Sequence, residues 1–368
     1  MMRRYQRRIV SVVLAVSVSA AVAVWAVQRR SPQPAPADFA QLVERFSEPG
    51  GFFDTDNLIS NERSYLHVFP ALERSGVTGG VYIGVGPDQN FSYIARIRPT
   101  VAFLIDIRRD NLLLHLLFKA LFAESRNRVE YLCLLTGRPF PQDAEAWDDA
   151  GIDRLADYID STEPRVSAAL GAILRETIRG FGVPLSAEEF RTMERFHSEF
   201  VRGGLSLQFK TFGRAIQSYN PTFRELLLET DRAGRQRSYL ASEQDFQLVR
   251  TLQPRGRVIP VVGDLAGDHA LAAIGEWMEE RGERLSAFYV SNVEDYLFRD
   301  RRFPLYIENL QGLPHSERSV VIRSLFGRMA EPDAMPGYYT ASTAQNVSEL
   351  LTNFSAGKYR SYYELVGR

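Results

Sequence analysis

The sequence is poor in several residue types that mark common functional classes. It contains one cysteine, five histidines, three lysines among 44 basic residues, and a net charge of −1. One cysteine excludes an intrachain disulfide and a cysteine-based metal cluster, and the apolar run around Cys133 predicts a buried, inert thiol. The small net charge gives no overall field that would favour nucleic acid, so no nucleic-acid partner is expected. P-loop, H-E-x-x-H and G-x-S-x-G patterns are missing, and the histidines lack metal-ligand spacing.

The N-terminal segment combines a basic cluster with a long uncharged run. Residues 9–27 carry no charge and are long enough to span a bilayer as a helix. Residues 1–30 are therefore predicted to be a transmembrane anchor, and a signal peptide cleaved near residues 21–23 is the alternative. Because the heavier positive cluster precedes the span, the N-terminus should stay in the cytoplasm and the domain should be exported to the periplasm. A cleaved form would instead be secreted. The four basic residues before the span are Arg3, Arg4, Arg7 and Arg8.

A strand, a glycine turn and a helix are predicted directly after residue 80. Residues 81–85 form a short apolar run, and Gly84 and Gly86 permit a tight turn that a ligand could approach closely. Asp88 and Asn90 are residue types that cap helices well, so a helix should begin there.

A second strand with an acid at its end follows this helix. Residues 100–105 are apolar, Asp106 comes next, and 22 positions separate it from Gly84. Nucleotide-binding units of this kind place a ribose-binding acid about 20 residues after their glycines. The dinucleotide pattern G-x-G-x-x-G is not present, because Gln89 stands where its last glycine would be. The alternative is an ordinary turn followed by a solvated aspartate.

With Gly84, Gly86 and Asp106 in these places, the segment resembles class I S-adenosylmethionine-dependent methyltransferases. The first motif of that family is a glycine loop after strand one, and the second is an acid at the end of strand two. Asp88 replaces the third loop glycine that is usual in the family. The string VYIGVGPDQNFSYIARIRPT also resembles an uncharacterised family of bacterial proteins, over most of the chain after residue 50.

Strand and helix patterns alternate again in the C-terminal part. This alternation predicts an α/β fold with a doubly wound, mostly parallel Rossmann-like sheet. The strands are expected at residues 257–262, 285–290 and 318–325, and the helices at residues 111–122, 270–280, 303–310 and 341–354.

Residues 140–240 have little strand pattern and predict a helical insertion that caps the sheet. Helices are expected there at residues 149–160, 163–181 and 186–202. The predicted organisation is an anchor or signal (1–30), a linker and entry helix (31–50), a first Rossmann-like half (51–139), the insertion (140–240), and a second half with a C-terminal helix (241–368).

Ligands of such sheets bind at the carboxyl ends of the strands, and several candidate residues directly follow predicted strands. The resemblance implies S-adenosylmethionine as the cofactor, with Asp106 on the ribose, Asp264 near the adenine, and Asn292 and Glu294 at the methyl-transfer cleft. Methyl transfer depends mostly on positioning, so no catalytic residue is named. The candidate cofactor-binding residues are Gly84, Gly86, Asp88, Asp106, Asp264 and Asn292.

Other polar clusters have open interpretations. Asp264, Asp268 and His269 could bind a metal ion, but a helix cap at Asp268 is favoured and no metal site is predicted. His115 lies in an apolar helix and is more typical of a packed core. Residues 203–223 could face a ligand, although ordinary packing is favoured. The acidic cluster of Asp54, Asp56, Asn61 and Glu62 would either fold over the ligand edge or remain solvated in a turn.

Two functions follow from these features. One is a membrane-anchored, methyltransferase-like enzyme that transfers a methyl group to an unknown acceptor. The other is a non-catalytic binding or scaffold protein of the cell envelope on the same fold. The signals conflict, because an exported domain would not normally meet S-adenosylmethionine.

The orientation of the domain can be tested with a reporter fused after Arg368. We expect alkaline phosphatase at this position to be active, because the basic cluster at the N-terminus retains that end in the cytoplasm. Activity of a cytosol-specific reporter at the same position would contradict the predicted export.

Overall fold

Six strands form one mostly parallel sheet at the centre of the fold. The computed structural model describes residues 38–367 except 144, 166 and 332. The strands are β1 (Val81–Val85), β2 (Val101–Asp106), β3 (Val258–Val262), β4 (Leu285–Ser291), β5 (His315–Phe326) and β6 (Thr340–Asn346). They follow the spatial order β3-β2-β1-β4-β5-β6. Strands β1 to β5 are parallel, and β6 runs antiparallel to β5.

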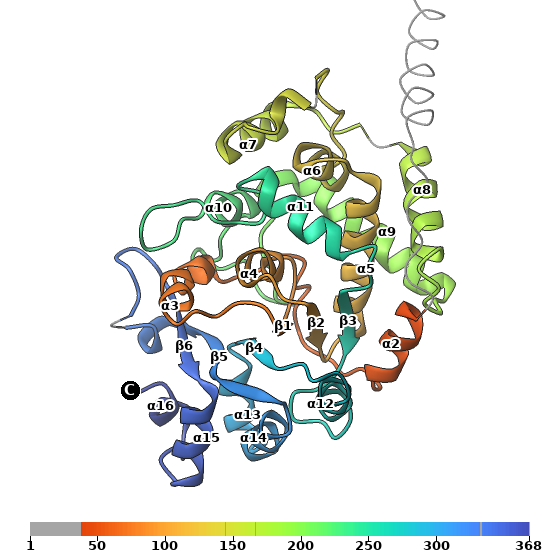
Figure 1. Cartoon of the computed structure of the whole chain (residues 1–368). Coiled ribbons are helices and arrows are strands. Elements are labelled where there is room, and N and C mark those ends of the chain that lie inside the picture. The colour runs from red at the N-terminus through yellow and green to blue at the C-terminus, as the bar shows by residue number, and fades with distance from the viewer. Residues whose placement is uncertain (1–37, 144, 166, 332, 368) are drawn as a thin grey trace, which may run out of the picture. The chain divides into compact units, whose positions relative to one another are not determined.

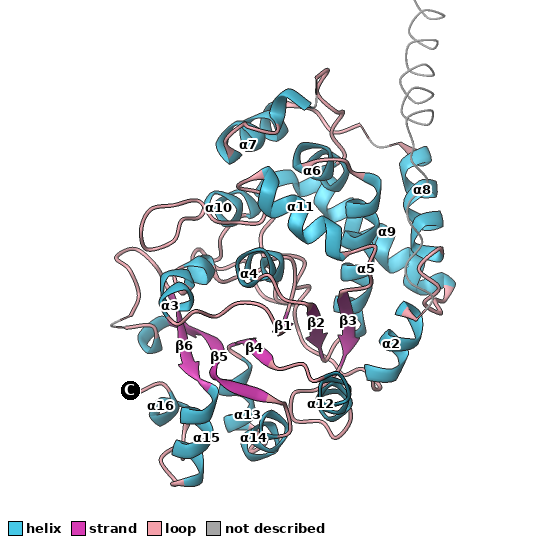
Figure 2. Cartoon of the chain, viewed as in Figure 1, coloured by secondary structure: helices cyan, strands magenta, loops and turns pink. Residues whose placement is uncertain are grey.

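Helices surround the sheet on both of its sides. They are α2 (Phe39–Phe46), α3 (Phe69–Arg74), α4 (Gln89–Ile97), α5 (Arg109–Glu124), α6 (Arg128–Thr136), α7 (Ile152–Ser161), α8 (Ala168–Arg179), α9 (Ala187–Gly203), α10 (Phe223–Leu228), α11 (Glu243–Leu252), α12 (Ala270–Arg281), α13 (Val293–Arg299), α14 (Phe303–Gln311), α15 (Val347–Ser355) and α16 (Tyr362–Leu365). Helices α4, α5 and α11 lie on one side, and α12, α13 and α14 on the other (Figure 1). The strands form a single central layer between them (Figure 2). The predicted α/β class and mostly parallel sheet are confirmed.

The central strands are apolar because both of their faces are covered. Every residue of β1 and β3 is buried, as is every residue of β2 except Asp106 at its end. A parallel sheet with helices on both faces requires such continuous apolar runs. This is why the run 81–85 could be predicted as a strand from the sequence, with bounds that the structure confirms.

Helix α5 is the most deeply buried helix next to these strands. Its residues from Asn111 to Phe122 are all buried, as its apolar sequence predicts, and it contacts β2, β3, α8 and α9. His115 is buried within it, and Cys133 is buried in α6. Both residues therefore belong to the core, as expected from their neighbours.

The C-terminal helix prediction was wrong over its first half. Residues 340–346 form β6, and helix α15 begins only at Val347. The strand pairs with β5 from Phe326–Thr340 to Val320–Asn346. Its sequence, TASTAQN, is polar, so only the open edge of β5 determines its structure. Asn346 then caps α15 by accepting a hydrogen bond from Glu349 N.

The three helices expected between residues 149 and 202 correspond to α7, α8 and α9. Ser186 forms a full capping box with Glu189 at the start of α9. Helix α8 begins later than predicted, with Ser167 as its N-cap. The predicted span at 9–27 lies outside the described residues. Within residues 38–367, as described, no helix is both long and apolar enough to cross a bilayer.

The glycine turn after β1 is filled by a side chain of the protein itself. A Cβ atom on Gly84 would lie 2.0 Å from Asn90 Oδ1. The Asn90 amide donates to the carbonyls of Val85, Gly86 and Pro87 at 2.9, 3.1 and 2.8 Å. Its oxygen accepts from Tyr82 Oη at 2.7 Å. Gly84 is therefore required by internal packing, because any side chain would displace Asn90.

We expect Gly84→Ala to lower the free energy of unfolding by about 1–3 kcal/mol or more, because the new methyl group collides with a buried hydrogen-bonded amide. Gly171→Ala in α8 is the matched control, since a Cβ atom there meets nothing within 4 Å. The control should be more stable than wild type by about 0.5–1 kcal/mol. Urea unfolding measures both changes, and a Gly84→Ala protein as stable as wild type would contradict this packing.

Candidate functional site

A single segment lies across the carboxyl ends of the strands. We call residues 47–64 the strap. At β3, Glu48 N donates to Val262 O at 2.9 Å, and Ser47 Oγ accepts from Val262 N at 3.1 Å. Glu48 also accepts from Asp264 N at 2.7 Å, directly after the strand. The strap therefore begins at the end of β3.

The strap continues past β2 and β1. Gly51 N donates to Ile107 O at 2.7 Å, just after β2. Thr55 O accepts from Arg108 Nη1 at 3.2 Å. Near β1, the Asn57 amide lies 3.7 Å from the position that a Cβ atom on Gly86 would take. The strap thus covers the glycine turn where a nucleotide would approach.

The strap ends at the other half of the sheet. Glu62 accepts hydrogen bonds from hydroxyl groups of Tyr289 and Ser291 in β4 and of Ser324 in β5. Ser64 Oγ donates to Thr340 Oγ1 in β6 at 2.8 Å. From Ser47 to Ser64, the strap therefore meets the strands in their spatial order, from β3 to β6.

The acidic cluster predicted before β1 is divided by this arrangement. Glu62 is 1% exposed and lies over the strand ends. Asp56 is partly buried and accepts from Lys210 N at 3.2 Å. Asp54 is more exposed and pairs with Arg214 at 3.5 Å. The first alternative, folding over the ligand edge, therefore holds for Glu62.

The segment 203–223 packs against the strap. Asp56 N donates to Lys210 O at 3.1 Å, and Phe212 N donates to Asp54 O at 2.8 Å. Thr55 and Thr211 form an isolated antiparallel bridge. These contacts are of the kind expected if the segment serves ordinary packing, which is the favoured interpretation.

The three candidates at the first turn, Gly84, Gly86 and Asp88, have different surroundings. Gly86 has a φ of 84°, a conformation that favours glycine. The space beside Gly84 is occupied by the Asn90 side chain, as described above. Asp88 is the N-cap residue of α4, where the helix was predicted to begin, but its side chain makes no capping hydrogen bond. Its carboxylate instead accepts from Tyr239 Oη at 3.2 Å in a buried cluster with Tyr131.

Asp106, the expected ribose acid, is already paired within the protein. One of its oxygens accepts from Arg108 Nε at 3.0 Å, and the other from Arg108 Nη2 at 2.9 Å. The Arg108 backbone N–H also donates to Asp106, at 2.9 Å. In this arrangement Asp106 does not fit the ribose-binding role, because Arg108 occupies both oxygens.

Asp264 and Asn292 lie after β3 and β4, as expected, but Asp264 is also engaged. Asp264 Oδ1 accepts from Ala266 N at 2.9 Å, and its other oxygen pairs with Arg302. Asn292 is partly exposed and accepts from Ser291 Oγ at 3.3 Å. Asp106, Asp264 and Asn292, at or just after the ends of β2, β3 and β4, therefore lie at one edge, and Asn292 is the least engaged of the three.

Glu294, expected at the cleft, is fully buried instead. It forms a two-point ion pair with Arg323, with Nη2 to Oε1 at 3.0 Å. Burial opposes the charge of Arg323, but the Glu294 carboxylate outweighs it and raises the pKa of Arg323. The ion pair joins α13 to β5 and stabilises their contact.

Two buried acids near this edge lack a basic partner among the described residues. Burial raises the pKa of Glu62, although the three hydroxyl donors oppose the shift. Burial also raises the pKa of Asp88 to about 7, against the hydrogen bond from Tyr239. Burial therefore favours the protonated form of both acids more than water does.

Several buried polar atoms, some of them beside Gly86, have no hydrogen-bond partner in the described part of the chain. Burial lowers the pKa of His115 to about 4, so the ring is neutral, and Nε2 donates to Gly86 O at 2.9 Å. His115 Nδ1 is then a free acceptor. The other unpartnered atoms are Thr55 Oγ1, Gln89 Oε1, and Nδ2 and Oδ1 of Asn111. Because buried polar groups are almost always paired, these atoms indicate water or a ligand.

The cluster after β3 does not assemble as a metal site in the described residues, where no group of three or more His, Cys, Asp or Glu side chains is arranged around a common point. The preferred cap at Asp268 is also wrong, because His269 is the N-cap of α12. Glu48 of the strap accepts from Ala270 N at 3.3 Å in its place.

Sequence reasoning missed the groups that fill the edge. Arg108 lies two positions after Asp106, and this short spacing is a signal that could have indicated their pairing. Asn90 gave no such signal, because its position suggested a helix cap. The hydroxyl partners of Glu62 come from strands more than 220 residues later in the chain, so no local pattern could have identified them.

The fold and the site define a mixed α/β protein whose strand ends are covered by its own chain. The chain belongs to the family of the domain of unknown function DUF7790, whose model matches residues 58–142 and 194–366. The matched ranges contain all six strands and Glu62. They leave out residues 143–193, which include α7 and α8. No curated protein matches the chain.

The raised pKa of Asp88 predicts a pH-dependent stability. The carboxyl titrates near 3.8 when unfolded and near 7 when folded. The folded state therefore binds the proton more tightly. The resulting stabilisation is complete below pH 3.8 and is lost as the pH rises through about 7.

We expect Asp88→Asn to remove this loss, because asparagine stays neutral and still accepts from Tyr239. Between about pH 5 and pH 8, the variant should gain on the order of a few kcal/mol in unfolding free energy relative to wild type. Urea unfolding at both pH values measures this difference. Asp268→Asn, at an exposed aspartate, is the control and should follow wild type. Parallel pH profiles for Asp88→Asn and wild type would rule out a buried proton at Asp88.

Proposed function

We propose that this protein is a non-catalytic binding or scaffold protein of the cell envelope, built on a Rossmann-like sheet. The observation that carries the proposal is the strap, which hydrogen-bonds at the ends of β2 to β6 and covers the turn after β1. Sheets of this strand order bind nucleotides at this edge. Here the edge is filled with internal hydrogen bonds and ion pairs instead.

The engaged acids support the same proposal. A ribose-binding acid must accept hydrogen bonds from ligand hydroxyls, whereas Arg108 occupies both Asp106 oxygens. Breaking a buried ion pair leaves an uncompensated charge and is strongly unfavourable. A ribose that binds Asp106 through both oxygens would have to compete with the bonds that Arg108 makes.

We further propose that residues 9–27 anchor the protein in the membrane and that the domain faces the periplasm. This placement rests on the uncharged span and the basic residues before it. Secretion after cleavage near residues 21–23 is the alternative. An envelope location suits a scaffold, because it requires no cytosolic cofactor.

The methyltransferase-like function, with S-adenosylmethionine bound at the strand ends, is the second candidate. The unpartnered atoms of Thr55, Gln89, Asn111 and His115 favour it, because Gln89 and His115 lie beside Gly86 in the turn that the resemblance assigns to the cofactor. They offer mainly acceptors, which would suit a ligand that carries hydroxyl or amino groups. This candidate requires Arg108 to release Asp106.

Calorimetric titration of S-adenosylmethionine and S-adenosylhomocysteine into the full chain distinguishes the two candidates. We expect no saturable binding at millimolar ligand, either by wild type or by Arg108→Met, in which the Asp106 carboxylate is set free. Asp268→Asn, at an exposed position, is the control for effects that arise from preparing any variant protein. Circular dichroism confirms that each variant is folded.

Saturable binding would reject the scaffold proposal and support the second candidate. Under that outcome, Asp106→Asn should weaken binding at least tenfold, because a charge-assisted hydrogen bond contributes about 1.5–3 kcal/mol. Binding that appears only in Arg108→Met would show that Arg108 is the group that closes the cofactor site.

A further inference from the structure

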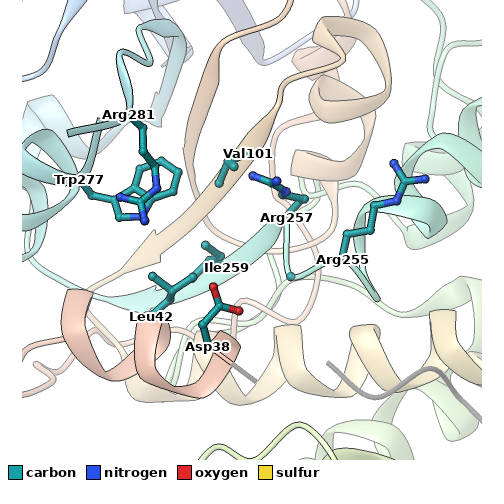
Figure 3. A pocket seen from close by; sticks show the side chains of 9 residues that line it. Asp38, Leu42, Val101, Arg255, Arg257, Ile259, Trp277 and Arg281 are labelled. Carbon is teal, nitrogen blue, oxygen red and sulfur yellow. The ribbon is translucent and has the colours of Figure 1, made fainter. Parts of the chain in front are cut away.

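A cavity of about 280 Å³ opens at the edge of the sheet opposite the strap. Val101, the first residue of β2, and Arg257, directly before β3, form one part of its wall. Parallel strands begin at this edge, so the cavity is separate from the candidate site at the carboxyl ends. Helices α2 and α12 contribute the remaining wall, with Leu42 and Trp277 among its residues (Figure 3).

The lining of this cavity has nine residues, three of them arginines. It includes Arg255, Arg257 and Arg281, and Asp38 is its one acidic residue. Among the described residues, no acidic side chain forms an ion pair with Arg255 or Arg257. Arg281 pairs only with its exposed neighbour Glu280, at 3.2 Å. The cavity therefore has an excess of uncompensated positive charge.

Two of the arginines are placed to act together. The guanidinium carbon of Arg281 lies 4.5 Å from the centre of the Trp277 ring. In Figure 3, the Arg257 guanidinium is directed toward the side where Arg281 covers Trp277. Arg255 points away from them, at the rim. Arg257 and Arg281 are thus the groups that a bound anion would meet.

The wall also contains a buried hydrogen-bond donor. Trp277 is 3% exposed, and its indole N–H has no partner among the described residues. Buried tryptophan N–H groups usually find an acceptor. The indole N–H is therefore an unsatisfied donor in the residue that Arg281 covers.

We propose that this cavity binds the phosphate group of a small phosphate ester. Guanidinium groups bind phosphate oxygens through paired, charge-assisted hydrogen bonds, and arginine suits this role better than lysine. Leu42 and Ile259 provide apolar contacts for a short carbon portion next to the phosphate. The cavity volume is slightly below the range for drug-sized ligands and matches an ester of this size.

The phosphate can come from two sources, a free ester or an anionic phospholipid headgroup. Asp38 lines the cavity and lies 11 positions after Val27, the last residue of the predicted span. Eleven extended residues reach at most about 40 Å. A headgroup of the membrane is therefore within reach of the cavity if residues 9–27 form the anchor.

Calorimetric titration of the full chain in uncharged detergent tests the proposal, with inorganic phosphate and glycerol 3-phosphate as probes. We expect saturable binding by wild type, and a loss of affinity on the order of tenfold or more in Arg257→Ala and in Arg281→Ala. Arg154→Ala is the matched control, because Arg154 covers Trp147 at 4.3 Å outside the cavity and should not affect binding. Chloride at equal ionic strength should give no saturable signal.

Equal affinities in wild type and Arg257→Ala, or no saturable binding of either probe, would overturn the proposal. Short-chain phosphatidylglycerol then identifies the source. Tighter binding of this lipid than of glycerol 3-phosphate, lost in Arg257→Ala, assigns the site to a headgroup. Tighter binding of glycerol 3-phosphate assigns it to a free ester.

Discussion

Polar groups at the carboxyl ends of parallel strands must be satisfied, and in this protein the strap satisfies them from within the chain. Its central interaction is the buried Glu62 carboxyl group, which accepts from hydroxyls of β4 and β5. An unpaired carboxylate would be very costly at 1% exposure, so the hydroxyls and the acid depend on one another. The position of the strap over the remaining strand ends follows from this attachment.

The same edge contains most features of a nucleotide site, but the protein already uses them. Arg108 neutralises Asp106, Asn90 fills the space beside Gly84, and Arg302 pairs with Asp264. Among the described residues, the unpartnered atoms of Thr55, Gln89, Asn111 and His115 and the partly exposed Asn292 are less engaged. A glycine turn and an acid at the right spacing therefore indicate a fold more securely than they indicate a ligand.

The parts of the fold that depend on local sequence could be predicted, and those that depend on distant partners could not. The strand at 81–85 and the cap at Ser186 follow from apolar runs and capping chemistry within a few residues. Strand β6 was missed because its polar sequence adopts a strand only beside β5. The convergence of the strand ends at one edge could be predicted, but the pairing of Asp106 with Arg108 depends on side-chain geometry that spacing alone does not determine.

The strap also has a consequence for how the chain reaches its native state. Ser64 is separated from Thr340 by 276 positions, and Glu62 from Ser324 by 262. During synthesis, the strap leaves the ribosome long before β5 and β6 exist. Contacts over such separations slow folding and leave intermediates open to aggregation. A nascent chain of this protein therefore cannot complete this edge of its sheet until β5 and β6 have been made.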